Sequence, residues 1–312
     1  MKTLAAFFRL VRWPNLVFIA LTQVLFEYCI YRKLYPASLI DAAETRQFIF
    51  LILASVLIAA AGYIINDYFD LNIDQVNKPG KVVVSVYINR RWVIFWHMSL
   101  SLLGLFFTVS ALPIDSYWYL VLGNLASIIL LWFYSTNLKK QLLIGNVLIS
   151  LLTAWVILVI FFSKYPLKIH SLLLVDPVEV RFFRFTVLYA SFAFIISLIR
   201  EVIKDMEDRE GDRKYNCRTM PILWGINVSK VFVAVWIIVL LAMVSIVQFY
   251  VLAFGWWHSV LYCILFIIAP LIWIFRKLFK AQSATDFHRL STVVKLVMLT
   301  GILSMLFFKI YL

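Results

Sequence analysis

Two groups of acidic residues in this chain of 312 residues have a spacing that suits the binding of divalent cations. Both follow the pattern i, i+3, i+7, which places three carboxylates on one face of a helix. The groups are Asp67, Asp70 and Asp74, and Asp205, Asp208 and Asp212. Mg²⁺ prefers oxygen ligands and usually takes one or two carboxylates, with phosphate and water completing its shell, so the two groups predict about two or three Mg²⁺ ions that hold a diphosphate.

The acidic groups could also be structural, or they could bind calcium. Helix-capping or solvated acids, paired with neighbouring lysines and arginines, would account for one such group but less readily for a matched pair. A calcium-binding loop fits poorly, although Asp70, Asn72 and Asp74 open like one. The sixth position of that loop holds Gln75 instead of glycine, and the twelfth holds Lys81 instead of glutamate.

The composition indicates an integral membrane protein. Hydrophobic residues make up 64% of the chain and charged residues only 14%, whereas a soluble domain is nearer half apolar and a quarter charged. The apolar residues form blocks of about twenty, the length that crosses a bilayer, which predicts an all-α protein with nine transmembrane helices. The blocks are Leu16–Ile30, Phe48–Ile65, Trp92–Leu112, Tyr117–Tyr134, Leu142–Phe162, Phe183–Ile203, Val231–Ala253, Trp257–Phe275 and Thr292–Leu312.

The basic residues predict how the chain is oriented. Of 29 lysines and arginines, 21 lie on the side of the first residues and 8 on the other, so the N-terminus and the loops 66–91 and 204–229, which bear the acidic groups, are predicted to be cytoplasmic. Residues 1–12 are expected to form an amphipathic interfacial segment of a single domain, 1–312. The net charge of +13 is therefore a topology signal and does not indicate a nucleic-acid partner, and the three cysteines show no disulfide or zinc spacing.

At the two acidic groups the chain resembles the UbiA superfamily of intramembrane prenyltransferases. The segment NDYFDLNID matches the superfamily's first signature, Asn-Asp-x-x-Asp-x-x-x-Asp, and DREGD matches its second, Asp-x-x-x-Asp. The resemblance extends over about residues 9–300 and also implies a nine-helix bundle. Further matches are Arg12-x-x-Asn15, Tyr134-Ser135-x-x-x-Lys139, Gly145-Asn146 and Thr219-x-Pro221.

Within the superfamily, the run KDMEDREGDRKYNCRTMPILWG is most similar to the geranylgeranylglyceryl phosphate geranylgeranyltransferases (digeranylgeranylglyceryl phosphate synthases). That group has Lys-Asp-x-Glu-Asp-x-x-Gly-Asp followed by Thr-Leu-Pro, and Met220 replaces the leucine here. The segment VNKPGKVVVSVYINRR also lacks the usual Arg-Pro-x-x-Pro and Ser-Gly. These departures bear on the acceptor more than on the chemistry.

The resemblance implies a Mg²⁺-dependent enzyme that transfers a prenyl group, expected to be geranylgeranyl, from its diphosphate to a lipid acceptor such as geranylgeranylglyceryl phosphate. It implies that Lys139 assists the leaving diphosphate. Asn66 is expected to be a neutral ligand or an orienter of metal-bound oxygen. Tyr63 and Tyr68 are, with Tyr134, the aromatic residues expected near the allylic cation. The catalytic candidates are Asp67, Asp70, Asp208, Asp212 and Lys139, and the substrate-binding candidates are Asn15, Asn66, Lys81, Tyr134, Arg200 and Lys204.

Several functional alternatives remain open from the residues alone. The acceptor could be aromatic, such as 4-hydroxybenzoate, homogentisate or a dihydroxynaphthoate. Outside the enzyme class, the chain could be an ion-coupled transporter, whose acids bind ions, or a non-catalytic lipid-binding scaffold that kept the fold; metal-dependent release of pyrophosphate would separate the enzyme from both. Arg200 and Glu201 are expected to be either a structural ion pair or an acceptor clamp, and His288 is expected to be solvated. Partners beyond substrates and membrane lipids are not expected.

Overall fold

The computed structural model describes residues 2–35, 42–77, 80, 82–165 and 176–311. In these residues there is no β-strand, and an isolated bridge between Val84 and Ile88 is the nearest approach to one. Within the described ranges, nine helical segments are long and apolar enough to cross a membrane. The prediction of an all-α protein with nine spans is therefore confirmed.

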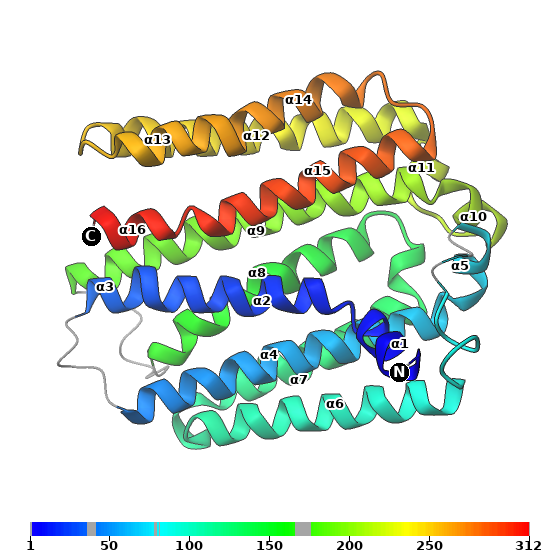
Figure 1. Ribbon diagram of the computed structural model, residues 1–312, viewed down its shortest axis with the longest axis horizontal. Helices are drawn as coiled ribbons and strands as arrows, with labels where there is room; N and C mark the ends of the chain where they lie inside the picture. Colours follow the sequence, from blue (N-terminus) through cyan, green and yellow to red (C-terminus); the bar gives the residue numbers. More distant parts are fainter. Residues whose placement is uncertain (1, 36–41, 78–79, 81, 166–175, 312) are drawn as a thin grey trace.

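Six spans are single helices and three are composite (Figure 1). The single helices are α4 (Ala42–Phe69), α6 (Arg90–Ala111), α7 (Ile114–Thr136), α8 (Ile144–Lys164), α9 (Pro177–Glu207) and α12 (Gly225–Leu252). The composite spans are α2 (Trp13–Leu25), η1 (Phe26–Tyr31) and α3 (Arg32–Leu34); α13 (Trp257–Cys263), η5 (Ile264–Ile268) and α14 (Ala269–Leu278); and α15 (Ala284–Leu303) and α16 (Leu306–Tyr311). Short helices outside the spans are α1 (Lys2–Leu10), α5 (Leu71–Asn77), η4 (Leu138–Lys140), α10 (Arg209–Lys214) and α11 (Met220–Leu223).

The helices extend beyond the apolar blocks wherever polar residues can continue or cap them. The block predicted to end at Ile65 continues as α4 to Phe69, so Asn66 and Asp67 lie on its last turn. At the start of α9, the Asp176 carboxylate accepts a hydrogen bond from the Val178 amide at 2.9 Å, which is the usual N-cap arrangement. Hydropathy alone identifies the apolar centre of each helix and underestimates its length.

The packing of the helices leaves room in the centre of the bundle. Helix α4 packs mainly against α6 and α7, and α9 packs mainly against α8 and α15. Figure 1 shows α5 and α10 side by side at the end of the bundle where α1 also lies, while the C-terminus is at the opposite end. The two chain segments that follow α4 and α9 therefore meet at one end of the molecule.

A buried ionic cluster holds the opposite end together. Glu27 lies in the π-helical segment η1 and is fully buried, and its carboxylate accepts hydrogen bonds from Lys164 at 3.0 Å and from Arg32 at 3.2 Å. Lys164 also pairs with Glu44, near the start of α4, at 2.6 Å. The cluster ties the first, second and fifth spans together, since a buried charge is stable only when it is paired.

Candidate active site

A cavity of about 1200 Å³ opens between α2, α4, α8, α9 and α15. The candidate residues from both acidic groups line it, although they come from distant parts of the sequence. Lys81 lies outside the described residues. The other candidates on the cavity wall are Asn15, Asn66, Asp67, Asp70, Asp74, Tyr134, Lys139, Arg200, Lys204, Asp205, Asp208 and Asp212.

Each acidic group spans a break between two helices, whereas the sequence predicted one continuous helix for each group. Asp70 lies between α4 and α5, and Asp208 lies between α9 and α10. Helical hydrogen bonds continue on both sides of the first break, from the Asp70 amide to the Asn66 carbonyl (2.9 Å) and from the Asp74 amide to the Asp70 carbonyl (2.8 Å). The breaks change the helix direction without unwinding the turn, which allows α5 and α10 to meet.

Asn77 joins the two acidic groups. Its side-chain amide donates to the carbonyl of Asp208 at 3.1 Å and accepts from the amide of Gly211 at 2.9 Å. A β-carbon at position 211 would overlap the Asn77 amide, so glycine is required for this close approach. The single asparagine therefore connects the end of α5, after the first group, to the start of α10, within the second.

Lys139 and Asn66 form a polar unit around Asp70. The Lys139 ammonium pairs with the Asp70 carboxylate at 2.5 Å and donates to the Asn66 carbonyl oxygen at 3.2 Å, while the Asn66 amide donates to Asp70 at 2.8 Å. Lys139 lies on the short helix η4. A β-carbon at Gly145 would lie 2.8 Å from the Lys139 α-carbon, so the absence of a side chain there lets η4 approach the start of α8.

Arg12 pairs with the first acid of the first group. Its guanidinium donates to the Asp67 carboxylate at 2.7 Å and lies 5.2 Å from the centre of the Tyr63 ring. The Arg12 backbone adopts a left-handed conformation, with φ at 51°, which is uncommon for a residue with a side chain. The Asp67 charge raises the pKa of Arg12 above its ordinary value. Sequence analysis did not select Arg12 as a site residue, although its match to Arg-x-x-Asn was the available signal.

The second acidic group is supported by α8. The Asn146 amide donates to the Asp205 carboxylate at 2.8 Å, and Asn146 follows the glycine that admits η4. This asparagine also was matched in sequence without being assigned a role. It holds the carboxylate of α9 in a fixed direction, as an amide donor to a charged acceptor does.

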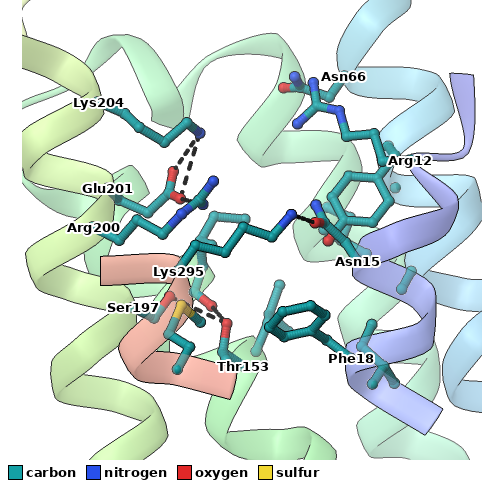
Figure 2. A pocket seen from close by; sticks show the side chains of 18 of the residues that line it. Arg12, Asn15, Phe18, Asn66, Thr153, Ser197, Arg200, Glu201, Lys204 and Lys295 are labelled. Atoms are coloured by element: carbon teal, nitrogen blue, oxygen red, sulfur yellow. Dashed lines mark hydrogen bonds and ion pairs between the residues drawn. The ribbon is translucent and has the colours of Figure 1, made fainter. Parts of the chain in front are cut away.

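Three cations form a separate wall of the cavity, shown in Figure 2. On α9, Arg200 and Lys204 both pair with the carboxylate of Glu201, at 3.0 and 3.2 Å. From α15, the Lys295 ammonium reaches across to the Asn15 side-chain oxygen on α2, at 2.7 Å. Arg200 and Glu201 therefore form the ion pair that was one of the two expectations for them. Lys295 is a cation of the cavity that sequence analysis did not identify.

The structure also places His288 and Tyr68. The His288 side chain is about half exposed, in agreement with its expected solvation, and its ring nitrogen lies 2.9 Å from the Glu207 carboxylate at the edge of the cavity. Tyr68 was expected near the reacting carbon, but its ring lies beneath the Arg90 guanidinium, at 4.6 Å. Tyr63 lines the cavity as expected.

The cavity offers oxygen donors for metal ions without a preformed cluster. In the part of the chain that the structure describes, no three aspartate, glutamate, histidine or cysteine side chains are grouped as for a metal ion. The carboxylates instead engage Arg12, Lys139 and Asn146. Burial raises the pKa of the cavity thiol Cys217 to about 11, so it remains protonated near neutral pH. The chemistry of this donor set suits a hard cation that takes its remaining ligands from phosphate.

The far part of the cavity is apolar. Below the charged residues its walls carry aromatic and aliphatic side chains from α2, α8, α9 and α15, including Phe18, Trp155, Tyr189, Phe192 and Met298. From Asp205 to Tyr189, α9 rises about 24 Å, at 1.5 Å per residue. The cavity therefore combines a charged end with a deep apolar groove, as a substrate with an ionic head and a long hydrocarbon chain would require.

The sequence of the chain is similar to one family of known proteins. The UbiA prenyltransferase family matches residues 35–300. A protein of Methanosphaera stadtmanae named digeranylgeranylglyceryl phosphate synthase is 29% identical over 248 residues, which cover 78% of this chain and 81% of that protein.

Solved structures share the fold at lower identity. One, described as digeranylgeranylglyceryl phosphate synthase in membranes, has a TM-score of 0.63 and 21% identity, covering 98% of this chain and 99% of the other. A UbiA homologue of Archaeoglobus fulgidus, bound to dimethylallyl diphosphate (DMAPP) and Mg²⁺, has a TM-score of 0.57 and 14% identity, covering 96% and 98%.

Proposed function

The chain belongs to the UbiA prenyltransferase family, and from that premise we propose that it transfers a prenyl group from an isoprenoid diphosphate to a lipid acceptor. The observation that carries the proposal is that one cavity holds both acidic groups at one end and has an apolar groove extending from them. We propose geranylgeranyl diphosphate as donor and geranylgeranylglyceryl phosphate as acceptor, because relatives along most of the chain are named for that product.

We propose that the six aspartates hold Mg²⁺ together with the donor diphosphate. Carboxylate oxygens from both groups border the same space, and one or two carboxylates per ion suffice when phosphate supplies the other ligands. When bound, the metal supplies positive charge that neutralises the leaving diphosphate. The proposed ligands are Asp67, Asp70, Asp74, Asp205, Asp208 and Asp212.

The chain's own cations complete this site. Lys139 lies 2.5 Å from Asp70 and is positioned by Asn66, so it can bind a diphosphate oxygen as the carboxylate turns to its metal ion. Arg12 is already paired with Asp67, and it too can bind a diphosphate oxygen. We propose Lys81 as a further diphosphate-binding residue.

The transfer itself requires an ionised donor and protection from water. The bond between carbon 1 of the prenyl group and the diphosphate oxygen breaks, and its electron pair leaves with the diphosphate. The acceptor hydroxyl oxygen forms the new bond to carbon 1, and its proton passes to the released diphosphate. Aromatic faces stabilise cations at about 6 Å or less; Tyr63 and Tyr134 line the cavity close to the acidic groups and are proposed for this role.

We also propose that residues 1–312 form one transmembrane domain whose acidic groups face the cytoplasm, with residues 1–12 at the interface and 66–91 and 204–229 as the cytoplasmic segments. The proposal rests on the excess of basic residues on that side. An impermeant thiol reagent added to intact cells should label Ser116→Cys and not Arg209→Cys, since the two exposed positions lie at opposite ends of the bundle. The reverse labelling would contradict this orientation.

The proposed function is tested with purified protein in detergent, labelled geranylgeranyl diphosphate, and a panel of acceptors with and without Mg²⁺. The panel holds geranylgeranylglyceryl phosphate, 4-hydroxybenzoate, homogentisate and a dihydroxynaphthoate. We expect a Mg²⁺-dependent product with the glyceryl phosphate and release of one pyrophosphate per product. A prenylated aromatic product would show that the proposed acceptor is wrong. The absence of pyrophosphate release with any donor would refute the proposed enzymatic activity.

Variants test the acidic groups directly. Asp67→Ala and Asp208→Ala should each abolish turnover, because each removes a proposed ligand from one of the two groups. Asp115→Ala is the matched control: this acid is exposed near the start of α7 and does not line the cavity. Full activity in either of the first two variants would rule out binding by both groups.

A further inference from the structure

We propose that Arg200, Lys204 and Lys295 form a second anion site in the cavity, which binds the phosphate of the lipid acceptor. This inference rests on the proposed function, and it separates the acceptor's head from the donor diphosphate, which the acidic groups hold. The ligand class is a phosphate monoester that carries a long hydrocarbon chain. Figure 2 shows the three cations directed into the same part of the cavity.

The charges on this wall do not balance. Arg200 and Lys204 share one carboxylate, that of Glu201. Lys295 bonds to the neutral amide of Asn15, and among the described residues no carboxylate pairs with it. Three cations therefore face one acid, which leaves two positive charges. A phosphate monoester carries about −1.5 to −2 at pH 7, which matches this surplus.

The individual contacts indicate capacity for another ligand. The Arg200 Nε atom is buried and has no hydrogen-bond partner among the described residues, although an unpaired buried donor is costly. The Lys295 ammonium lies 5.3 Å from the centre of the Phe18 ring and uses one of its three donors on Asn15. A phosphate oxygen could accept from the remaining lysine donors.

The site lies where an acceptor head would have to be. Arg200 precedes Asp205 by five residues on α9, a rise of about 7.5 Å towards the apolar groove. Asp205 itself accepts a hydrogen bond from Asn146 on α8, at 2.8 Å, and belongs to the second acidic group. A phosphate at the cationic wall would place the neighbouring glycerol hydroxyl between that wall and the donor, and the acceptor chain in the groove.

The competing assignment is that the same cations bind the donor diphosphate. The two assignments differ in which substrate loses affinity when a cation is removed. We therefore compare geranylgeranylglyceryl phosphate with geranylgeranylglycerol, its dephosphorylated form, in the wild-type protein and in Lys295→Met. A residue that holds the acceptor phosphate must lose its effect when that phosphate is absent.

The wild-type protein should use the phosphorylated acceptor at least tenfold better, as kcat/KM, than the dephosphorylated one. Lys295→Met should lower kcat/KM for the phosphorylated acceptor by about tenfold to a hundredfold, the effect of one hydrogen bond between charged groups. For the dephosphorylated acceptor, which lacks the phosphate that Lys295 is proposed to bind, kcat/KM should change by less than about threefold. The KM of the donor should not change. Lys295→Arg should retain part of the preference, because the charge remains.

The matched control is Arg289→Gln, which removes one positive charge from an exposed position on the same helix α15, outside the cavity. It should leave both acceptors unaffected. Lys139→Met should instead lower activity equally with both acceptors, because it acts on the donor. Equal losses with both acceptors in Lys295→Met, or no preference for the phosphate in the wild-type protein, would overturn the inference.

A binding measurement separates this inference from the proposed function. In the absence of donor and Mg²⁺, geranylgeranylglyceryl phosphate should raise the thermal unfolding temperature of the wild-type protein more than that of Lys295→Met, because a ligand stabilises the state that binds it. If this shift is found while no acceptor is prenylated, the anion site stands and the proposed reaction fails. If turnover is found but the shift is equal in both proteins, the reaction stands and the anion site fails.

Discussion

The bridge made by Asn77 predicts an unusual relation between two substitutions. Asn77→Ala removes two hydrogen bonds to the backbone of positions 208 and 211. At about 0.5–1.5 kcal/mol each, their loss should cost about 1–3 kcal/mol. Because the bridge positions the segments that carry both acidic groups, we expect this loss to appear as a reduction of kcat/KM by about tenfold to a hundredfold.

Gly211→Ala should cause the same loss by a different route. Its new methyl group would occupy the space of the Asn77 amide, and overpacking of this kind costs about 1–3 kcal/mol. When Asn77→Ala is already present, that space is empty. The second substitution should then be neutral or favourable by up to about 1 kcal/mol, since alanine is the better helix former and position 211 lies within α10.

The assay is a double-mutant cycle on kcat/KM, with the concentration of Mg²⁺ that gives half-maximal activity as a second readout. The double variant should be about as active as Asn77→Ala alone, so the two single losses should exceed the double loss by about 1–3 kcal/mol. Additive losses would refute the reasoning, because they would mean that the two positions act independently. Gly80→Ala serves as the control, since a β-carbon there meets no neighbour within 4 Å.

Three further predictions concern other positions. Gly145→Ala should displace the short helix that bears Lys139 and lower kcat/KM by about tenfold or more, at about 1–3 kcal/mol for overpacking, while the detergent-purified protein remains monodisperse by size-exclusion chromatography. Glu27→Ala should lower the thermal unfolding temperature because Lys164 loses its fully buried carboxylate partner and keeps only the partly exposed Glu44, at a cost towards the lower end of about 3–5 kcal/mol; an unchanged unfolding temperature would contradict this. Lys230→Met removes hydrogen bonds to carbonyls at the end of α14 and should reduce stability by about 1–3 kcal/mol, with the KM values of both substrates unchanged in steady-state assays.

The features that the sequence predicted correctly are local ones. Nine spans follow from nine apolar blocks, because burial in lipid requires about twenty consecutive apolar residues. The six aspartates were found because each group lies within eight consecutive residues. No local pattern indicated the breaks at Asp70 and Asp208, because they depend on the meeting of α5 with α10, two segments more than a hundred residues apart.

The features that could not be predicted are single polar residues whose partners are remote. Asn77 is one asparagine in a polar loop until α10 folds against it. Lys295 contacts Asn15 across 280 residues of chain, and no motif in its neighbourhood marks it. Glu27 was overlooked because one acid in an apolar block barely changes hydropathy, although its partners come from the fifth span and the end of its own.

The contact between Asn15 and Lys295 has a consequence for biosynthesis. One side of the cavity is formed by α2 and the other by α15, so the enclosure is completed only when the ninth span joins the first. At about 5–20 residues per second, translation of the intervening chain takes roughly 15–60 s. During that time Arg12, Asp67 and the other charged residues of the early spans face an open bundle, and they must find water, lipid head groups or each other. During membrane insertion, the charged residues of the cavity are therefore least shielded after the first spans are made and before the ninth span joins them.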